Sequence, residues 1–145
     1  MRALIQRVSE AAVDVDDGRI ARIGPGLLIF LGIADTDGET QARFVADKCL
    51  NLRIFEDADG KFNHSALEVN ADILVVSQFT LYGNTRKGRR PSFDNAASPG
   101  HSEPLYERFV ELLQERGLKI ETGRFGAMMK VRLVNDGPVT ILVEK

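Results

Sequence analysis

The sequence is poor in cysteine and aromatic residues and has no long apolar run. Its single cysteine, Cys49, excludes an internal disulfide, and the Cys/His content is too small for a zinc cluster. The longest apolar stretch, residues 27–34, is too short to cross a bilayer, and the first residues lack the apolar region of a signal peptide. We therefore expect a cytoplasmic protein with no membrane segment, metal or cofactor.

Neither sign of charge dominates the chain. It has 145 residues, of which 19 are basic and 21 acidic, and this balance argues against a wholly basic nucleic-acid surface. Apolar residues make up 43%, as in ordinary globular proteins, so we expect one domain over residues 1–145. Four cations nevertheless fall within five positions, at Arg86, Lys87, Arg89 and Arg90. Residues 85–90, here called the basic loop, are a concentrated positive spot on an acidic body.

Apolar patterning predicts a sheet and two helices. The continuous apolar runs 27–33 and 73–76 are typical of strands buried on both faces. Asp-Gly at 17–18 predicts a hairpin, and a turn is predicted at 24–26. Further strands are predicted at residues 3–8, 12–15, 19–23, 52–55, 119–121, 129–134 and 139–143.

The first helix is predicted to begin at a cap on Thr36 or Asp37, and the second at a cap on Ser102 after a loop over 91–101. Gly117 ends the second helix. The apolar stripes are Ala42, Val45, Ala46 and Cys49 in the first helix, and Leu105, Phe109, Leu112 and Leu113 in the second. Cys49 is thus interpreted as a core residue rather than a nucleophile. The sum is a single-domain α+β fold, with a mainly antiparallel sheet curled towards a barrel and two principal helices.

Polar side chains follow the second buried strand, at residues 77–81 (Ser-Gln-Phe-Thr-Leu). Polar groups at the end of a buried strand are held rigidly and often form a site. Strand alternation would place Gln78 and Thr80 on one face, and Ser77 and Phe79 on the other. The alternative is a strand end that merges into a polar turn, and the spacing alone leaves both interpretations open.

Two other features could carry chemistry. Neither His64 nor His101 has a neighbouring nucleophile in the sequence, so both are predicted to be exposed loop residues and a Ser-His-Asp triad has no support. The basic loop follows the 77–81 segment within ten residues. It is either a solvated charge run or a set of phosphate contacts that anchors an RNA or nucleotide without reading bases.

Residues 135–138 (Asn-Asp-Gly-Pro) also allow two interpretations. Asp-Gly favours a hairpin turn between the last two strands. Proline, however, removes a backbone donor where the next strand begins to pair. A cis Gly137-Pro138 bond would instead turn adjacent carbonyl oxygens to one side and make a rigid pair of acceptors.

Together, segments 77–81 and 135–140 resemble the paired signatures of the D-aminoacyl-tRNA deacylase family, also called the D-tyrosyl-tRNA deacylase family, in its bacterial form. Residues 1–8 (Met-Arg-Ala-Leu-Ile-Gln-Arg-Val) and 123–129 (Gly-Arg-Phe-Gly-Ala-Met-Met) resemble it as well. The resemblance covers essentially the whole chain, without a departure at the signature positions.

The resemblance implies a homodimer that hydrolyses the ester of D-aminoacyl-tRNA, and also glycyl-tRNA mischarged on tRNA(Ala). Gly137 and Pro138 would form a cis wall that enters the partner's pocket, captures the substrate's α-amino group and excludes an L side chain. Thr80, Ser77 and Gln78 would be catalytic, and Phe79, Phe125, Ala127, Met128 and Met129 would bind substrate. The aminoacylated 3′ end of tRNA would be the ligand, with Arg86, Lys87, Arg89 and Arg90 on its phosphates.

An aminoacyl ester is already labile, so the site needs to orient water and stabilise an oxyanion. Backbone N–H groups near residues 77–80 suit the second task. The sequence offers no evident base for Thr80, which favours a positioning or donor role over a nucleophile, and the ribose 2′-hydroxyl is the alternative activator. Three rivals remain: a non-catalytic RNA-binding module, an editing hydrolase for glycyl- or L-alanyl-tRNA, and a general esterase that uses Thr80 or Ser77.

Overall fold

A computed structural model describes residues 1–16 and 18–145 of the chain. The main sheet has the order β2-β1-β3-β6-β7, and β8 pairs with the other side of β1. Its strands are β1 (Arg2–Val15), β2 (Gly18–Ile23), β3 (Gly26–Gly32), β6 (Asp72–Ser77), β7 (Ile120–Thr122) and β8 (Lys130–Glu144). A small second sheet pairs β4 (Phe55–Glu56) with β5 (Phe62–His64). The helices are α1 (Glu39–Asn51), the 3₁₀-helix η1 (Phe79–Tyr82) and α2 (Pro99–Gln114).

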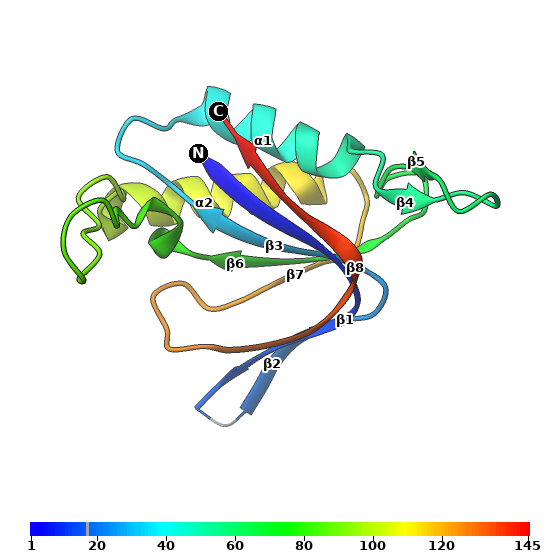
Figure 1. The fold of residues 1–145 in the computed structure, drawn as a ribbon, viewed down its shortest axis with the longest axis horizontal. Coiled ribbons are helices and arrows are strands. Elements are labelled where there is room, and N and C mark those ends of the chain that lie inside the picture. Colours follow the sequence, from blue (N-terminus) through cyan, green and yellow to red (C-terminus); the bar gives the residue numbers. More distant parts are fainter. Residues whose placement is uncertain (17) are drawn as a thin grey trace.

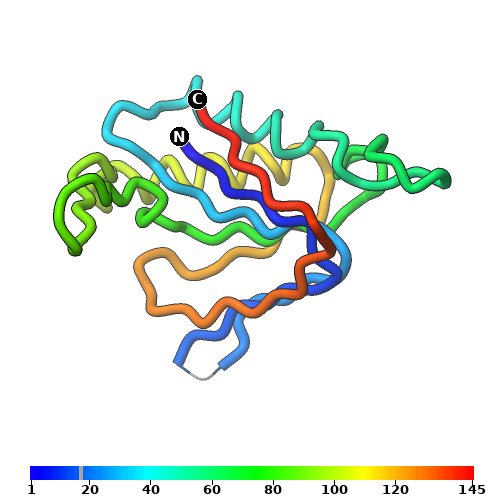
Figure 2. Tube along the Cα trace, in the orientation of Figure 1, coloured from blue at the N-terminus to red at the C-terminus, as the bar shows by residue number. Residues whose placement is uncertain are grey.

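Strand β1 organises the sheet. Its first half pairs with β3, its second half with β2, and β8 follows it along most of its length. The sheet therefore bends along β1 and curls, with α1 and α2 together beside its upper part (Figure 1; the trace in Figure 2 shows the same curl). This confirms the predicted α+β class and the curled sheet. Two of the pairings, β3–β6 and β6–β7, are parallel.

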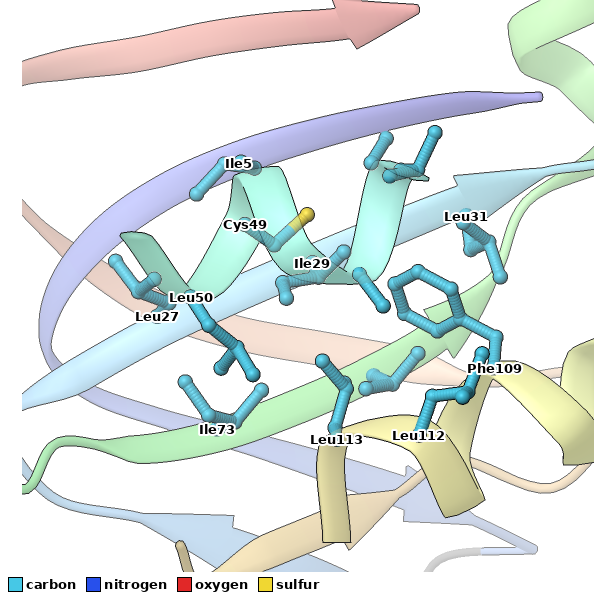
Figure 3. Packing of buried hydrophobic residues seen from close by; sticks show 14 of the residues in the cluster. Ile5, Leu27, Ile29, Leu31, Cys49, Leu50, Ile73, Phe109, Leu112 and Leu113 are labelled. Carbon is cyan, nitrogen blue, oxygen red and sulfur yellow. The ribbon is translucent and has the colours of Figure 1, made fainter. Parts of the chain in front are cut away.

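The core confirms that β3 and β6 are buried on both faces. Leu27, Ile29 and Leu31 of β3 belong to a cluster with the apolar faces of α1 and α2 (Figure 3). Leu28 points the other way, into a second cluster inside the curl of the sheet. Cys49 is fully buried in the first cluster, and burial raises the pKa of its thiol to about 12, as suits the predicted core residue.

Two pairs of predicted strands are each one continuous strand. The first pair, 3–8 and 12–15, forms β1, and the second, 129–134 and 139–143, forms β8. Both halves of β8 pair with β1, with register shifts between Gln6 and Val8 and between Val8 and Glu10. Residues 135–138 are therefore an elbow within one strand, and the hairpin interpretation was wrong. Asp17, in the first predicted hairpin, lies outside the described residues.

The predicted helix starts were wrong by one to four residues. Gly38, rather than Thr36 or Asp37, is the N-cap of α1, and the Asp37 carboxylate instead accepts hydrogen bonds from the Met1 ammonium and the Ala34 N–H. Helix α2 begins within the predicted loop: Ser98 is its N-cap and proline occupies the first turn, where a missing N–H costs little. Of the predicted strand 52–55, only Phe55 is in β4, because α1 extends to Asn51. Within the described residues, no helix is long and apolar enough to span a bilayer.

One ion-pair cluster predicts a measurable pH dependence. Arg19 Nε lies 2.9 Å from Asp14 Oδ1, and Arg132 Nε lies 2.8 Å from Oδ2. The hydrogen bonds from Arg19 and Arg132 lower the pKa of Asp14 from 3.8 to about 2. A carboxyl whose pKa is lower in the folded state stabilises the fold above its unfolded pKa, and that stabilisation is lost as the pH falls from about 4 towards 2.

We therefore expect Asp14→Asn to remove this part of the acid dependence, as measured by urea unfolding between pH 2 and 5. Asp59→Asn, in an exposed turn, is the matched control and should keep the wild-type slope. Equal slopes for wild type and Asp14→Asn would contradict the prediction.

Candidate active site

A hollow of about 700 Å³ opens where β6 ends, and it collects most of the predicted site residues. Its walls come from the ends of β3 and β6, from η1, from the segment before α2 and the first turn of α2, and from the loop between β7 and β8. The predicted residues that line it are Ser77, Gln78, Phe79, Thr80, Phe125, Ala127, Met128 and Met129. Residues that the sequence did not mark as functional line it too, among them Phe93, Ala96, Ala97, Pro99 and Ser102. The hollow is thus a largely apolar pocket with a polar edge.

The polar edge is fixed by the end of the buried sheet. Ser77 is the last residue of β6 and pairs with Leu31 of β3, whose carbonyl accepts a 2.8 Å hydrogen bond from the Gln78 N–H. The chain then turns into η1 rather than continuing as a strand, so the predicted face alternation at 77–80 was wrong. The first N–H groups of a helix have no acceptor within it. In η1 these belong to Phe79 and Thr80.

The η1 turn brings Gln78 and Thr80 together by another route. The Gln78 amide Nε2 donates a hydrogen bond to the Thr80 hydroxyl oxygen, and the Thr80 residue is exposed at the edge of the hollow. An amide is not a base, so this contact orients the hydroxyl without activating it as a nucleophile.

Neither histidine lines the hollow. His64 lies in β5 and His101 in α2, so the prediction that both are loop residues was wrong. His101 Nε2 lies 2.9 Å from the Asp37 carbonyl oxygen, a contact that holds the start of α2 against the start of α1.

The opposite wall comes from the loop between β7 and β8. The Phe125 ring packs against Tyr106 of α2 with centroids 5.9 Å apart, and the Tyr106 hydroxyl donates to the Val75 carbonyl at 3.0 Å. Burial raises the pKa of Tyr106, so the hydroxyl stays a donor. Met128 is 92% exposed and stands at the rim. A fixed aromatic ring beside a free thioether gives a flat apolar wall that suits a planar ring system.

The basic loop begins three residues after the end of η1 and does not line the hollow. Its base is closed by two backbone hydrogen bonds between Asn84 and Ser92, at 2.8 and 3.1 Å. All four cations are exposed, and Arg86 lines a neighbouring polar hollow with Tyr82 and Gly83. The loop therefore presents exposed positive charge shortly after η1 in the chain, outside the hollow.

The elbow at residues 135–138 is exposed yet firmly held. The Gly137-Pro138 bond is cis, as the second interpretation of this segment expected. Below it, Arg7 is 5% exposed and donates from Nε to the Asp136 carbonyl at 3.0 Å and from Nη1 to the Ile54 carbonyl at 2.7 Å. The Asn135 amide donates to the Arg7 carbonyl and the Val139 carbonyl, at 3.1 and 2.9 Å.

Arg7 is a functional candidate that the sequence reasoning missed. It shares the inward face of β1 with Ala3 and Ile5, both fully buried. A charged residue in an otherwise apolar alternation is the signal that marks it, because a buried guanidinium needs partners.

The elbow and the hollow lie at opposite ends of the same strand. Val8 pairs with both Asn135 and Gly26, at the start of β3, whereas Ser77 pairs with Leu31 near its end. Five residues of β3 separate these positions, about 16 Å at about 3.3 Å per residue. In Figure 1 the bend of β8 lies at the end of the sheet opposite η1. Gly137 and Pro138 do not line the hollow of their own chain.

In the part of the chain that the structure describes, no three His, Cys, Asp or Glu side chains gather as metal ligands.

Known proteins resemble the chain over its whole length. The D-aminoacyl-tRNA deacylase of Thermotoga petrophila is 58% identical over 144 residues, covering 99% of this chain and 97% of that protein. The D-aminoacyl-tRNA deacylase of Brevibacillus brevis is 57% identical, with 99% of each chain covered.

Solved structures share the fold of the chain. A protein titled c-Myc DNA Unwinding Element Binding Protein superposes with a TM-score of 0.94 at 41% identity, covering 100% of this chain and 99% of that one. A probable eukaryotic D-amino acid tRNA deacylase has a TM-score of 0.85 at 22% identity and shares the fold. The family model described as D-Tyr-tRNA(Tyr) deacylase matches residues 4–144. The chain therefore belongs to the D-Tyr-tRNA(Tyr) deacylase family, a family of hydrolases.

Proposed function

We propose that this chain hydrolyses the ester between a D-amino acid and the 3′ end of tRNA, in a homodimer whose two sites each combine the hollow of one subunit with the Gly137-Pro138 elbow of the other. The observation that carries the proposal is the separation of the two motifs along β3. Each motif is well formed, but neither faces the other within one chain. A second copy supplies the missing half.

The hollow suits the terminal adenosine and the ester. Phe125 and the Met128–Met129 pair give a flat apolar wall for a base, and Phe79 stands 55% exposed at the edge. Next to that wall, the N–H groups of Phe79 and Thr80 suit a developing oxyanion. One such donor contributes about 3–4 kcal/mol to the stability of a transition state. The ribose 2′-hydroxyl is then placed to orient the attacking water.

The elbow suits the chiral step. D and L residues exchange a hydrogen and a side chain at one carbon, so apolar burial alone does not separate them. A rigid wall where an L side chain must go does separate them. Backbone held by Arg7 and Asn135 is such a wall, because main chain does not swing aside as a side chain does. Glycine has no side chain to exclude, so glycyl-tRNA mischarged on tRNA(Ala) is also a substrate.

The test is a panel of charged tRNAs incubated with the purified protein, with loss of ester followed over time. We expect D-tyrosyl-tRNA and glycyl-tRNA(Ala) to be hydrolysed and L-tyrosyl-tRNA to persist. Binding of D-tyrosyl-tRNA without ester loss would favour the non-catalytic RNA-binding alternative. Preferred cleavage of L-alanyl-tRNA, or of simple esters without RNA, would favour the other rivals.

Thr80→Ala is expected to slow deacylation by about tenfold to a hundredfold without abolishing it. The Thr80 hydroxyl contacts an amide rather than a base, so it orients groups instead of attacking the ester. Single-turnover rates on D-tyrosyl-tRNA measure the effect, and Thr80→Ser should stay close to wild type. Complete loss with intact folding and binding, or a trapped acyl-enzyme, would show that Thr80 is a nucleophile.

A further inference from the structure

We propose that Phe93 is a positioning residue of the site, which clamps η1 at both ends and so sets the position of Thr80. This inference rests on the proposed function. Phe93 lies outside all the segments that the sequence marked as functional, yet its side chain lines the hollow. It comes from the stretch that joins the basic loop to α2.

The Phe93 ring meets the first residue of η1 edge-on. Its centroid lies 5.1 Å from that of Phe79, with 70° between the ring planes. This is the edge-to-face arrangement that aromatic pairs favour. The Phe79 side chain is more than half exposed to solvent, and the Phe93 ring packs against it. The pair therefore limits how the exposed ring moves.

The same ring also touches the end of η1. A Cβ on Gly83, the C-cap of η1, would stand 3.1 Å from Phe93 Cε1 and 3.0 Å from the Thr80 carbonyl oxygen. Such distances are tighter than ordinary contacts, so the ring lies against bare backbone. Thr80 sits between the two contact points, and its carbonyl accepts the Gly83 N–H at 2.9 Å.

Phe93 is itself anchored on both sides. The Asn84–Ser92 backbone pair precedes it, its own carbonyl accepts the Ala96 N–H at 2.9 Å, and the Ala97 N–H donates to the Ile33 carbonyl at 2.9 Å. The ring is thus tied to the closed base of the basic loop and to the end of β3. No residue of η1 is buried. The Phe93 contacts therefore add to the hydrogen bond from Arg2 Nη1 to the Leu81 carbonyl, at 2.8 Å, in fixing η1 on the sheet.

The experiment measures kcat and KM for D-tyrosyl-tRNA separately. We expect Phe93→Ala to lower kcat about tenfold while KM changes less than twofold, because η1 is mispositioned and the basic loop still binds RNA. Phe93→Leu keeps an apolar side chain but has no ring edge, so its kcat should lie between those of the wild type and Phe93→Ala. Gly83→Ala would bring a Cβ against both the ring and the Thr80 carbonyl oxygen, so it should lower kcat as well. Phe44→Ala, an aromatic on α1 remote from the hollow, is the control and should leave kcat unchanged.

A double-mutant cycle with Phe79→Ala separates positioning from general destabilisation. Once Phe79 is truncated, removing Phe93 should lower kcat by less than threefold further, because contacting residues are coupled. Full kcat in Phe93→Ala, or the same tenfold loss in both backgrounds, would overturn the inference. An inactive wild-type protein would instead contradict the proposed function, so the two failures are distinguishable.

Discussion

Replacing Gly137 with alanine is expected to reduce D-tyrosyl-tRNA deacylation at least about tenfold and to narrow the difference between D and L substrates. A Cβ at this position would stand 2.5 Å from Asn135 Oδ1. Asn135 then has to give up its hydrogen bonds to the Arg7 and Val139 carbonyls, and the elbow shifts. A displacement of about 1 Å in a positioning element can cost about a hundredfold in rate.

The measurement is the ratio of first-order rates on D- and L-tyrosyl-tRNA, with the oligomeric state of each variant checked by sedimentation. Leu142→Ala, an exposed position on the same strand outside the 135–140 segment, is the control and should keep the wild-type ratio. Arg7→Lys should act in the same direction as Gly137→Ala, because an ammonium does not reproduce the planar fork that holds two carbonyls. Full activity and full L rejection in Gly137→Ala would refute the wall.

Neutralising the basic loop is expected to weaken tRNA binding more than any other change in surface charge. With Arg86, Lys87, Arg89 and Arg90 all replaced by glutamine, we expect at least about a tenfold loss of affinity near 0.1 M salt. The slope of log affinity against log salt should fall by about 0.7 for each single-strand phosphate that the variant no longer binds. The loop cations are exposed and come shortly after η1 in the chain, so we expect them to contact RNA beyond its last nucleotide.

Fluorescence anisotropy with labelled tRNA at several salt concentrations measures both quantities. A matched control neutralises four exposed cations elsewhere, Arg43, Lys48, Lys61 and Arg116, which changes the net charge equally. If the control lost as much affinity as the loop variant, the effect would be one of net charge. An unchanged affinity and an unchanged salt slope would show that the loop is a solvated charge run that does not bind RNA.

Much of the fold followed from local patterns in the sequence. The apolar runs of β3 and β6 identified strands buried on both faces, and helical stripes located α1 and α2. The single-strand nature of β8 did not follow, because Asp-Gly-Pro has the local chemistry of a turn. Pairing with β1 on both sides of residues 135–138 overrides it, and such long-range pairing leaves no local mark. The early start of α2 had a signal in Ser98 and Pro99, although both fell within the predicted loop.

The part of the candidate site that follows a buried strand could be predicted from the sequence. The parts that depend on tertiary contacts could not. Residues of the 77–81 segment and of the 123–129 segment line the same hollow, and their role as a site stays a prediction. Phe93 gave no signal, because a single phenylalanine in a polar loop fits no periodic pattern. Arg7 did give one, since its place on an inward face requires partners that only the folded chain shows.

The separation of hollow and elbow along β3 has a consequence for mixed assemblies. If each subunit lends its elbow to the other, a chain defective in the elbow and a chain defective in the hollow complement each other. Their heterodimer would have one site with an intact hollow and an intact elbow, and a second site in which both are defective. Two variants that are each inactive alone would then recover activity when they are co-expressed. A monomer would have no complete site.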